Sequence, residues 1–162
     1  MTDKKYAEFI AVANHCLRGN QAAVNFMLLI CDILHVWDDL IDRDKPANND
    51  DIHRAFYGAL VRLPRDPFYS ANFLLLNPIL EMAILNWQAA NEMEAVGDEA
   101  GLRIAFILRS TYADLATMCA RIVGGELWAR QKGGEIRRHW HDEGWDGYLS
   151  NLANEKKVRA EQ

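Results

Sequence analysis

The apolar segment from 22 to 36 constrains the fold of this chain more than any other feature. An ordinary surface helix keeps a polar face toward water, and this segment is too continuously hydrophobic to do so. Its spacing of three and four residues predicts a helix from about 21 to 43. We expect that helix to be central and the most buried, with Phe26, Leu29 and Ile33 out of solvent.

The rest of the chain is also helical in pattern, and no segment alternates with a period of two. The sequence therefore predicts an all-α fold, a single bundle of six to eight helices, with residues 1–162 as one domain and a frayed charged tail at about 155–162. Capping residues and breakers place the other helices at about 6–17, 50–63, 78–96, 99–123, 135–143 and 147–158, with short helical turns near 68–76 and 127–128. The expected N-caps are Asn20, Asn49 or Asp50, Asn77 and Asp98. Helix breaks are expected at Gly19, Gly97 and Gly124–Gly125. The core face expected for the third helix, at 50–63, is Ile52, Phe56, Leu60 and Leu63.

Composition excludes several classes of function. Half of the residues are hydrophobic and a quarter are charged, which argues against disorder. The net charge of −5 argues against nucleic acid as the main partner, because phosphate binding needs clustered Lys and Arg. Cys16, Cys31 and Cys119 lie in apolar helical pattern, and we expect buried reduced thiols. With no signal peptide and no apolar membrane span in view, the expected location is cytoplasmic and soluble.

Acidic residues follow one face of the 21–43 helix. We call Asn25, Asp32, His35, Asp39 and Asp42 the acidic stripe; they fall within roughly 100° of arc, with Asp38 beside them. No Lys or Arg lies between Arg18 and Arg43, so the compensating charge must be a cation or a distant part of the chain. Carboxylates one turn apart suit Mg²⁺, and the candidate metal ligands are Asp38, Asp39, Asp42 and His35. A hydrated helix end is the alternative.

A second polar face is predicted on the helix at 99–123. Arg103, Ser110, Asp114, Thr117 and Arg121 fall within about 60° of one another on a continuous helix. If this face meets the acidic stripe, the two arginines either form a buried ion-pair network with it or clamp a phosphate held by a bound cation. Both alternatives stay open at this point.

The sequence resembles a known family at these positions. The run from Asp38 to Asp42, DDLID, is similar to the first aspartate-rich DDxxD motif of class I isoprenoid synthases. Tyr112 with the run 120–125, ARIVGG, is similar in order and spacing to a helix of the squalene and phytoene synthase branch, and the run 142–146, DEGWD, has the spacing of a second acidic motif. The resemblance implies an all-helical, Mg-dependent transferase or lyase acting on a diphosphate-bearing small molecule. In it Asp38, Asp39 and Asp42 are catalytic, while Arg103, Arg121 and Tyr112 bind substrate.

The tryptophans support a hypothesis from a different class. Five are present, and Trp128, Trp140 and Trp145 cluster near His139 and His141. Tryptophan is enriched at interface hot spots, although it also fills gaps in small cores. The two histidines are two residues apart and face away from each other on a helix, which is a weak pattern for a metal site. The alternative function is therefore a non-enzymatic structural or adaptor subunit of a larger assembly, such as a virus particle, with a homo-oligomer or an assembly partner bound through Trp-containing surfaces. No pattern for nucleophilic catalysis is present.

Overall fold

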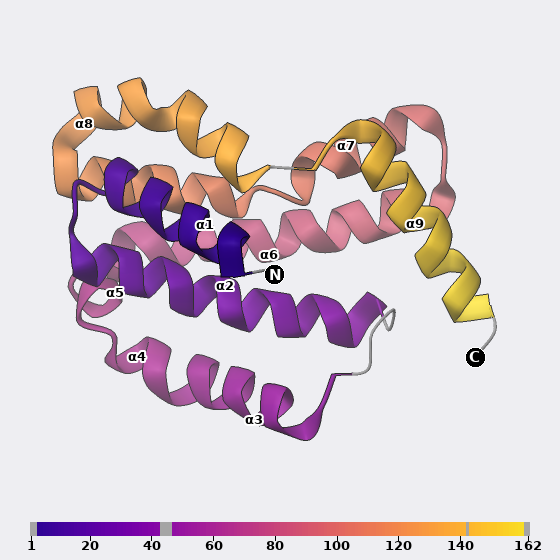
Figure 1. The fold of residues 1–162 in the computed structure, drawn as a ribbon, viewed down its shortest axis with the longest axis horizontal. Helices are drawn as coiled ribbons and strands as arrows, with labels where there is room; N and C mark the ends of the chain where they lie inside the picture. The colour runs from indigo at the N-terminus through magenta and orange to yellow at the C-terminus, as the bar shows by residue number, and fades with distance from the viewer. Residues whose placement is uncertain (1–2, 43–46, 142, 161–162) are drawn as a thin grey trace. The chain divides into compact units, whose positions relative to one another are not determined.

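The structure, a computed structural model, describes residues 3–42, 47–141 and 143–160 and is all-α within them (Figure 1). Within that part of the chain seven helices have nine or more residues, so the predicted bundle of six to eight helices is confirmed. They are α1 Asp3–Cys16, α2 Gln21–Asp42, α3 Asn49–Tyr57, α6 Phe73–Val96, α7 Glu99–Leu108, α8 Tyr112–Trp140 and α9 Trp145–Ala160. Shorter turns join α3 to α6, namely the π-helix η1 Gly58–Arg62, α4 Leu63–Arg65 and α5 Pro67–Ala71.

The chain divides into two compact units, which we describe separately. Unit 1 comprises residues 1–24 and 72–143, and unit 2 comprises residues 25–71 and 144–162. Unit 1 thus holds α1, α6, α7 and α8, and unit 2 holds most of α2 together with α3, η1, α4, α5 and α9. The expectation of one domain stays a prediction.

In unit 1, α6 and α7 form an antiparallel pair through a turn that the sequence specifies locally. Gly97 takes a left-handed conformation with φ of 79°, and its N–H donates to the Met93 carbonyl. Asp98 then caps α7 by accepting a hydrogen bond of 2.9 Å from the Gly101 N–H. Both the glycine stop and the aspartate cap were predicted, and both are confirmed.

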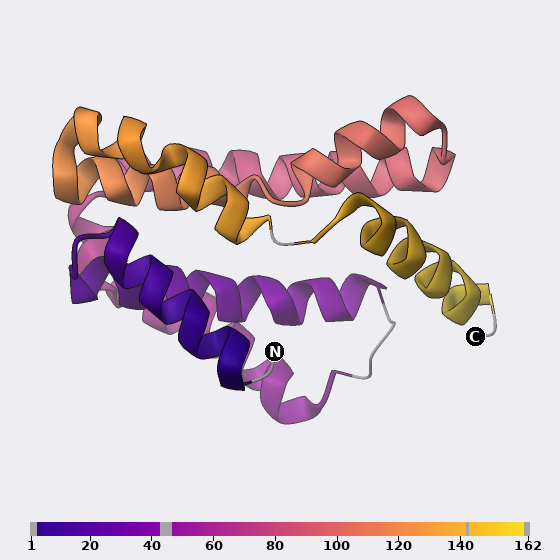
Figure 2. The same ribbon diagram turned by 45° about the horizontal axis from the view of Figure 1, so that its top comes forward.

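Helix α8 folds back on itself at the predicted glycine pair, as Figure 2 shows. Gly125 has φ of 82° and ψ of 176°, values that L-residues rarely adopt. At Gly124 an added Cβ would lie 2.3 Å from Cδ1 of Trp128, so only glycine lets that ring approach. The two arms are held by Tyr112, whose hydroxyl donates to the Trp140 carbonyl at 3.1 Å, and by an ion pair between Asp114 and Arg137.

Trp128 also connects α8 to α1. Its Nε1 donates to the carbonyl of Cys16, the last residue of α1, at 2.8 Å. The final carbonyls of a helix have no partner within the helix, so this bond satisfies one of them. The chain then turns through Arg18 and Gly19, both at positive φ, and Asn20 caps α2 by accepting from the Ala23 N–H at 3.0 Å.

In unit 2, α2 supplies large buried side chains. Phe26 is fully buried and stacks on Tyr69 of α5 with ring centroids 5.6 Å apart, and Leu29 is also buried. Ile33 is half-buried and lies beside Gly58, where an added Cβ would be 3.2 Å from its Cγ1. The expectation that these three side chains leave solvent is therefore met for Phe26 and Leu29 and in part for Ile33.

Several predicted boundaries are wrong. The expected helix at 99–123 is broken after α7, because Ser110 and Thr111 bond back to the carbonyls of Ile107 and Leu108. Helix α6 begins at Phe73 and contains Pro78 instead of starting there.

Two further expectations also differ from the structure. The second arm of α8 is continuous through Gly133 and Gly134, where two separate short helices were expected. On α3 and η1, Phe56 is 58% exposed and Leu60 is 72% exposed, so the expected core face is wrong at these two positions. Ile52 and Leu63 of that face are half-buried, and Ala55 and Gly58 are buried.

Helix α6 is also, among the described helices, the one with the length and composition to cross a membrane. Only 22% of its most apolar 18-residue window is buried. One such helix is weak evidence for a membrane span, and α6 packs along both α7 and α8 within unit 1.

Candidate functional site

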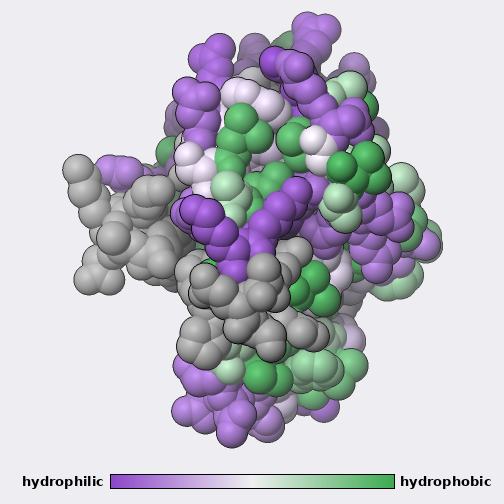
Figure 3. Space-filling view, turned by 90° about the vertical axis from the view of Figure 1, so that its right-hand side faces the viewer, coloured by the Kyte–Doolittle hydropathy of each residue, from purple (hydrophilic) through white to green (hydrophobic). Residues whose placement is uncertain are grey.

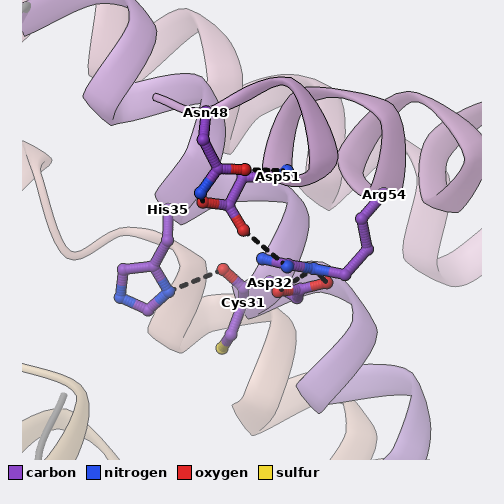
Figure 4. A network of polar contacts seen from close by, with 6 residues as sticks. All are labelled: Cys31, Asp32, His35, Asn48, Asp51 and Arg54. Carbon is purple, nitrogen blue, oxygen red and sulfur yellow. Dashed lines mark hydrogen bonds and ion pairs between the residues drawn. The ribbon is translucent and has the colours of Figure 1, made fainter. Parts of the chain in front are cut away.

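The acidic stripe meets α3 through Arg54, which lies 22 residues after Asp32 in the chain (Figure 4). Arg54 Nε donates to both carboxylate oxygens of Asp32, at 3.2 and 3.0 Å, and Nη1 donates to Asp51 Oδ1 at 2.6 Å. The hydrogen bonds that Arg54 donates to the two carboxylates, that to Asp32 first, raise the pKa of Arg54 above its ordinary value. Of the two predicted alternatives, a cation or a distant part of the chain, Asp32 has the second, because its partner Arg54 belongs to α3.

Asp51 is fixed from its other side by the cap of α3. Asn48 Oδ1 accepts from the Asp51 N–H at 2.8 Å, and Asn48 Nδ2 donates to Asp51 Oδ2 at 2.6 Å. The N-cap is thus Asn48, one residue before the predicted Asn49 or Asp50. The cluster is open to water, because the side chains of Asp32 and Asp51 are 35% and 34% exposed and that of Arg54 is 47% exposed.

His35 is exposed and has a fixed ring orientation. Its Nδ1 lies 2.7 Å from the Cys31 carbonyl, which can only accept, so Nδ1 carries the proton in that bond. The lone pair of the neutral ring is then on Nε2. Asp38 and Asp39 follow one turn later and are half-buried, while Asp42 is the last residue of α2 and its side chain lies outside the described part.

The pairing of the two helices brings more acid to this end of unit 2. Figure 1 shows that α2 and α3 run antiparallel, and contacts of Asp32 with Arg54 and of Ile33 with Gly58 join them. The last turn of α2 therefore lies at the same end as the first turn of α3, which carries Asp50 and Asp51. Among the described side chains no group of three or more His, Cys, Asp and Glu is placed to hold a metal ion.

The predicted substrate-binding residues lie in unit 1, and each has different neighbours. Arg103 on α7 is 62% exposed and pairs with Glu99 one turn earlier at 2.8 Å. Arg121 on α8 is exposed, with Nη1 3.8 Å from the Met118 sulfur. Tyr112 joins the arms of α8. Because α7 and α8 are separate helices, the shared face expected for Arg103 and Arg121 is wrong; their meeting with Asp38 and Asp39 stays a prediction.

Sequence reasoning missed a second arginine cluster, centred on Arg109. Arg109 donates to Glu94 through Nε at 2.9 Å and through Nη2, and also to Asn91 Oδ1 at 2.8 Å. Its guanidinium lies 5.2 Å from the ring centroid of Trp87. The Glu94 side chain is 5% exposed and that of Arg109 is 19% exposed. All three partners belong to α6, so the cluster ties α6 to the break between α7 and α8.

A third polar cluster surrounds the end of α1. Lys132 Nζ donates to Glu135 at 2.8 Å and lies 2.5 Å from His15 Nε2. Lys132 and Arg18 both lie over the Trp128 ring, at 5.2 and 5.4 Å from its centroid. Burial raises the pKa of the Cys16 thiol to about 11, so Cys16 is a thiol at neutral pH and not an activated nucleophile.

The remaining predicted residues have structural neighbours. Cys16 and Cys119 are buried as expected, and Cys31 is half-buried. His139 stacks on Phe9, whereas the ring of His141 meets Phe106 edge-on, so the two histidines face different neighbours. Trp140 is 3% exposed. Asp142, the first residue of the second acidic motif, lies outside the described part, and Asp146 is in the first turn of α9.

Comparison of the chain with protein-family models, with curated proteins and with solved structures gave no match. The resemblance to isoprenoid synthases therefore stays a prediction that rests on the residues given above.

Proposed function

We propose that this chain is a non-enzymatic helical subunit that acts by binding another protein. The exposed apolar side chains of α3 and η1 carry this proposal. Phe56, Tyr57 and Leu60 are 58%, 50% and 72% exposed and lie within one turn of one another. Contiguous apolar patches on a soluble protein mark interaction sites more often than single exposed hydrophobic residues do.

The direction of the acidic stripe supports the same function. A surface network joins Asp32, Asp51 and Arg54, whose side chains are each about one-third to one-half exposed. An enzyme site, by contrast, is typically a cavity into which acidic and arginine side chains converge. Figure 3 shows hydrophobic side chains at the surface among hydrophilic ones. A reducing cytoplasm, or an assembly within it, is the location that we propose from the free thiols.

The test is the mass of the chain in its own cells. We expect in-cell cross-linking of the tagged chain, followed by mass photometry, to give one complex of fixed stoichiometry. A variant with Phe56→Gln and Leu60→Gln on α3 and η1, and Leu74→Gln and Leu85→Gln at two further exposed leucines on α6, should lose it, because these exposed apolar side chains are gone. The control Glu126→Gln, an exposed residue of α8, should keep it. A chain that stays monomeric in cells would overturn the proposal.

His35 supports a second candidate, a divalent-cation site for a diphosphate-bearing ligand at Asp38, Asp39 and Asp42. Its Nδ1 bond to the Cys31 carbonyl is the arrangement that orients many ligating histidines. The carboxylate oxygens fit Mg²⁺, whereas an imidazole suits Mn²⁺ better than Mg²⁺. When bound, the cation would neutralise a diphosphate and stabilise a leaving group.

Calorimetric titration with MgCl₂ and MnCl₂, with and without pyrophosphate, tests this second candidate. If the site exists, we expect saturable binding of the cation by the wild type and none by Asp38→Ala/Asp42→Ala. The control Glu126→Ala on α8 should bind the cation as the wild type does. Equal heats for the wild type and the Asp38→Ala/Asp42→Ala variant would remove it and leave the first proposal intact.

A further inference from the structure

Helix α6 has apolar side chains on two opposite sides. Leu76, Ala83 and Ala90 are at most 8% exposed and face the interior of unit 1. A second set points away from them by roughly 130° at 100° per residue. We call this set the outer face of α6: Leu74, Leu75, Pro78, Met82 and Leu85, all of which are exposed.

The outer face is extensive. Leu74, Met82 and Leu85 are 86%, 53% and 48% exposed. From Leu74 to Leu85 the helix rises roughly 17 Å, about three turns. A helix that is apolar on all sides is normally buried on all sides, and α6 is covered on one side only. Desolvating the outer face is therefore favourable for any partner that fits it.

The charge around this face has a single sign. Between Asp66 and Leu102 the chain has five Asp and Glu and no Lys, Arg or His. Glu94 is neutralised by Arg109 inside unit 1. Glu81 and Glu92 are exposed, and their positions on the helix place them along one edge of the outer face.

We infer that the outer face of α6 binds a cationic amphipathic helix of another protein, with apolar anchors one turn apart and Lys or Arg beside them. This inference rests on the proposed function and names its partner class. Helix-in-groove recognition uses anchors at i, i+3 or i+4 and i+7, and the acidic edge matches flanking cations. Met82 has a flexible side chain that adapts to different anchors.

The same charges argue against two other occupants. In a contact between two copies of α6, Glu81 and Glu92 of one copy would lie near those of the other, and like charges across an interface are unfavourable. An anionic lipid surface attracts Lys and Arg and would repel this edge.

The test measures binding of a labelled peptide to the full chain by fluorescence anisotropy. The probe is an amphipathic peptide of about 18 leucine and lysine residues, with leucines at i, i+3, i+4 and i+7. A peptide with glutamate in place of each lysine is its matched partner. We expect saturable binding of the lysine peptide, and binding at least about tenfold weaker for Leu74→Gln/Leu85→Gln, because two central anchors lose their contacts.

Two further variants separate the contribution of the acidic edge to peptide binding from that of exposed apolar residues elsewhere on the chain. Glu81→Lys/Glu92→Lys should weaken binding of the lysine peptide by about threefold or more and strengthen binding of the glutamate peptide. Phe56→Gln/Leu60→Gln, which changes exposed residues of α3 and η1, should change binding less than about twofold. Circular dichroism and the Tm of each variant establish that it is folded.

Several results would overturn the inference. In the anisotropy measurement, these are equal binding of the lysine peptide by the wild type and by Leu74→Gln/Leu85→Gln, or equal binding of the two peptides by the wild type. Flotation of the chain with neutral or anionic vesicles that depends on Leu74 and Leu85 would show that the occupant is a lipid surface. A dimer in light scattering that the same substitutions dissociate would show that the occupant is a second copy of the chain. A stoichiometric complex in cells that survives Leu74→Gln/Leu85→Gln would overturn this inference while the proposed function stands. A chain monomeric in cells would remove both.

Discussion

Arg109 in unit 1 and Arg54 in unit 2 make similar sets of bonds in different surroundings. Each guanidinium bridges two polar side chains. For Arg109 these are Glu94 and Asn91, both of α6, whereas for Arg54 they are Asp32 of α2 and Asp51 of its own helix, α3. The Arg109–Glu94 pair is 19% and 5% exposed, whereas Arg54 is 47% exposed.

Burial changes what these bonds do. Inside unit 1 an unpaired charge is costly, so Arg109 and Glu94 each hold the other in place and fix the break between α7 and α8. At the surface of unit 2 water competes with every bond that Arg54 makes. The buried cluster is thus a structural lock, while the exposed cluster can exchange its partners for a ligand.

Glu94→Ala should have the largest effect. It leaves the guanidinium of Arg109 without its carboxylate in a mostly buried place, and the expected loss is about 3–5 kcal/mol in the free energy of unfolding. Urea denaturation followed by circular dichroism measures it. The control Glu92→Ala removes an exposed carboxylate of the same helix and should stay within about 0.5 kcal/mol of the wild type.

The double variant Glu94→Met/Arg109→Met sharpens this expectation. Removing both charges leaves no stranded group, so it should recover most of the loss seen in Glu94→Ala. A double variant as unstable as Glu94→Ala would show that packing, and not the stranded charge, explains the single change.

Glu135→Gln should have an intermediate effect that depends on pH. The hydrogen bond from Lys132 lowers the pKa of Glu135 below its ordinary value of 4.5. A lowered pKa in the folded state stabilises the fold above the unfolded value, and this contribution is lost as pH falls through the folded value. Both the exposure of Glu135 and screening by water limit it to about 0.2–1 kcal/mol at pH 7.

Denaturation of the wild type and of Glu135→Gln across pH 2 to 7 checks the sign. The difference between them should be largest near neutrality and shrink on acidification, whereas the control Glu126→Gln should differ little from the wild type at any pH. A difference that grows toward acid pH would contradict the Lys132 contact.

Local signals predicted much of the fold. Asn20, Gly97, Asp98 and the glycine pair at 124–125 act within a turn of their own position, and each has its expected role. The break at Ser110 and Thr111 was missed because periodicity continues through it. The helix breaks there because the hydroxyls of Ser110 and Thr111 donate to backbone carbonyls three residues earlier, and because Arg109 contacts α6. The contact of Arg109 is a tertiary interaction, which a local pattern does not predict.

The predicted start of α6 was wrong for a related reason. A proline usually lies in the first turn of a helix, because it has no N–H to donate to the carbonyl of the residue four positions earlier. Here that residue is Leu74, which is 86% exposed, so water can reach its carbonyl. Sequence alone does not give that exposure.

The candidate site was predictable only in part. The acidic stripe implied a distant partner, but the pairing of Asp32 with Arg54 depends on the antiparallel register of α2 and α3. Arg103 and Arg121 were placed on one helix by a periodicity that does not survive the break. Side-chain geometry at Asp42 lies outside the described part, so the metal set remains a prediction.

Arg54→Ala should have an effect no larger than that of Glu135→Gln. Its bonds to Asp32 and Asp51 are exposed, and exposed pairs contribute about 0.2–1 kcal/mol, less at high salt. We therefore expect a small loss of stability in 20 mM salt that nearly vanishes in 1 M salt, measured by urea denaturation. The control Arg62→Ala, an exposed arginine of η1, should show no change in either buffer. A loss as large as that of Glu94→Ala, or one independent of salt, would show that Arg54 is a structural lock like Arg109. Asp32 and Asp51 would then be unavailable to any ligand, while the second candidate function, which uses Asp38, Asp39 and Asp42, would be unaffected.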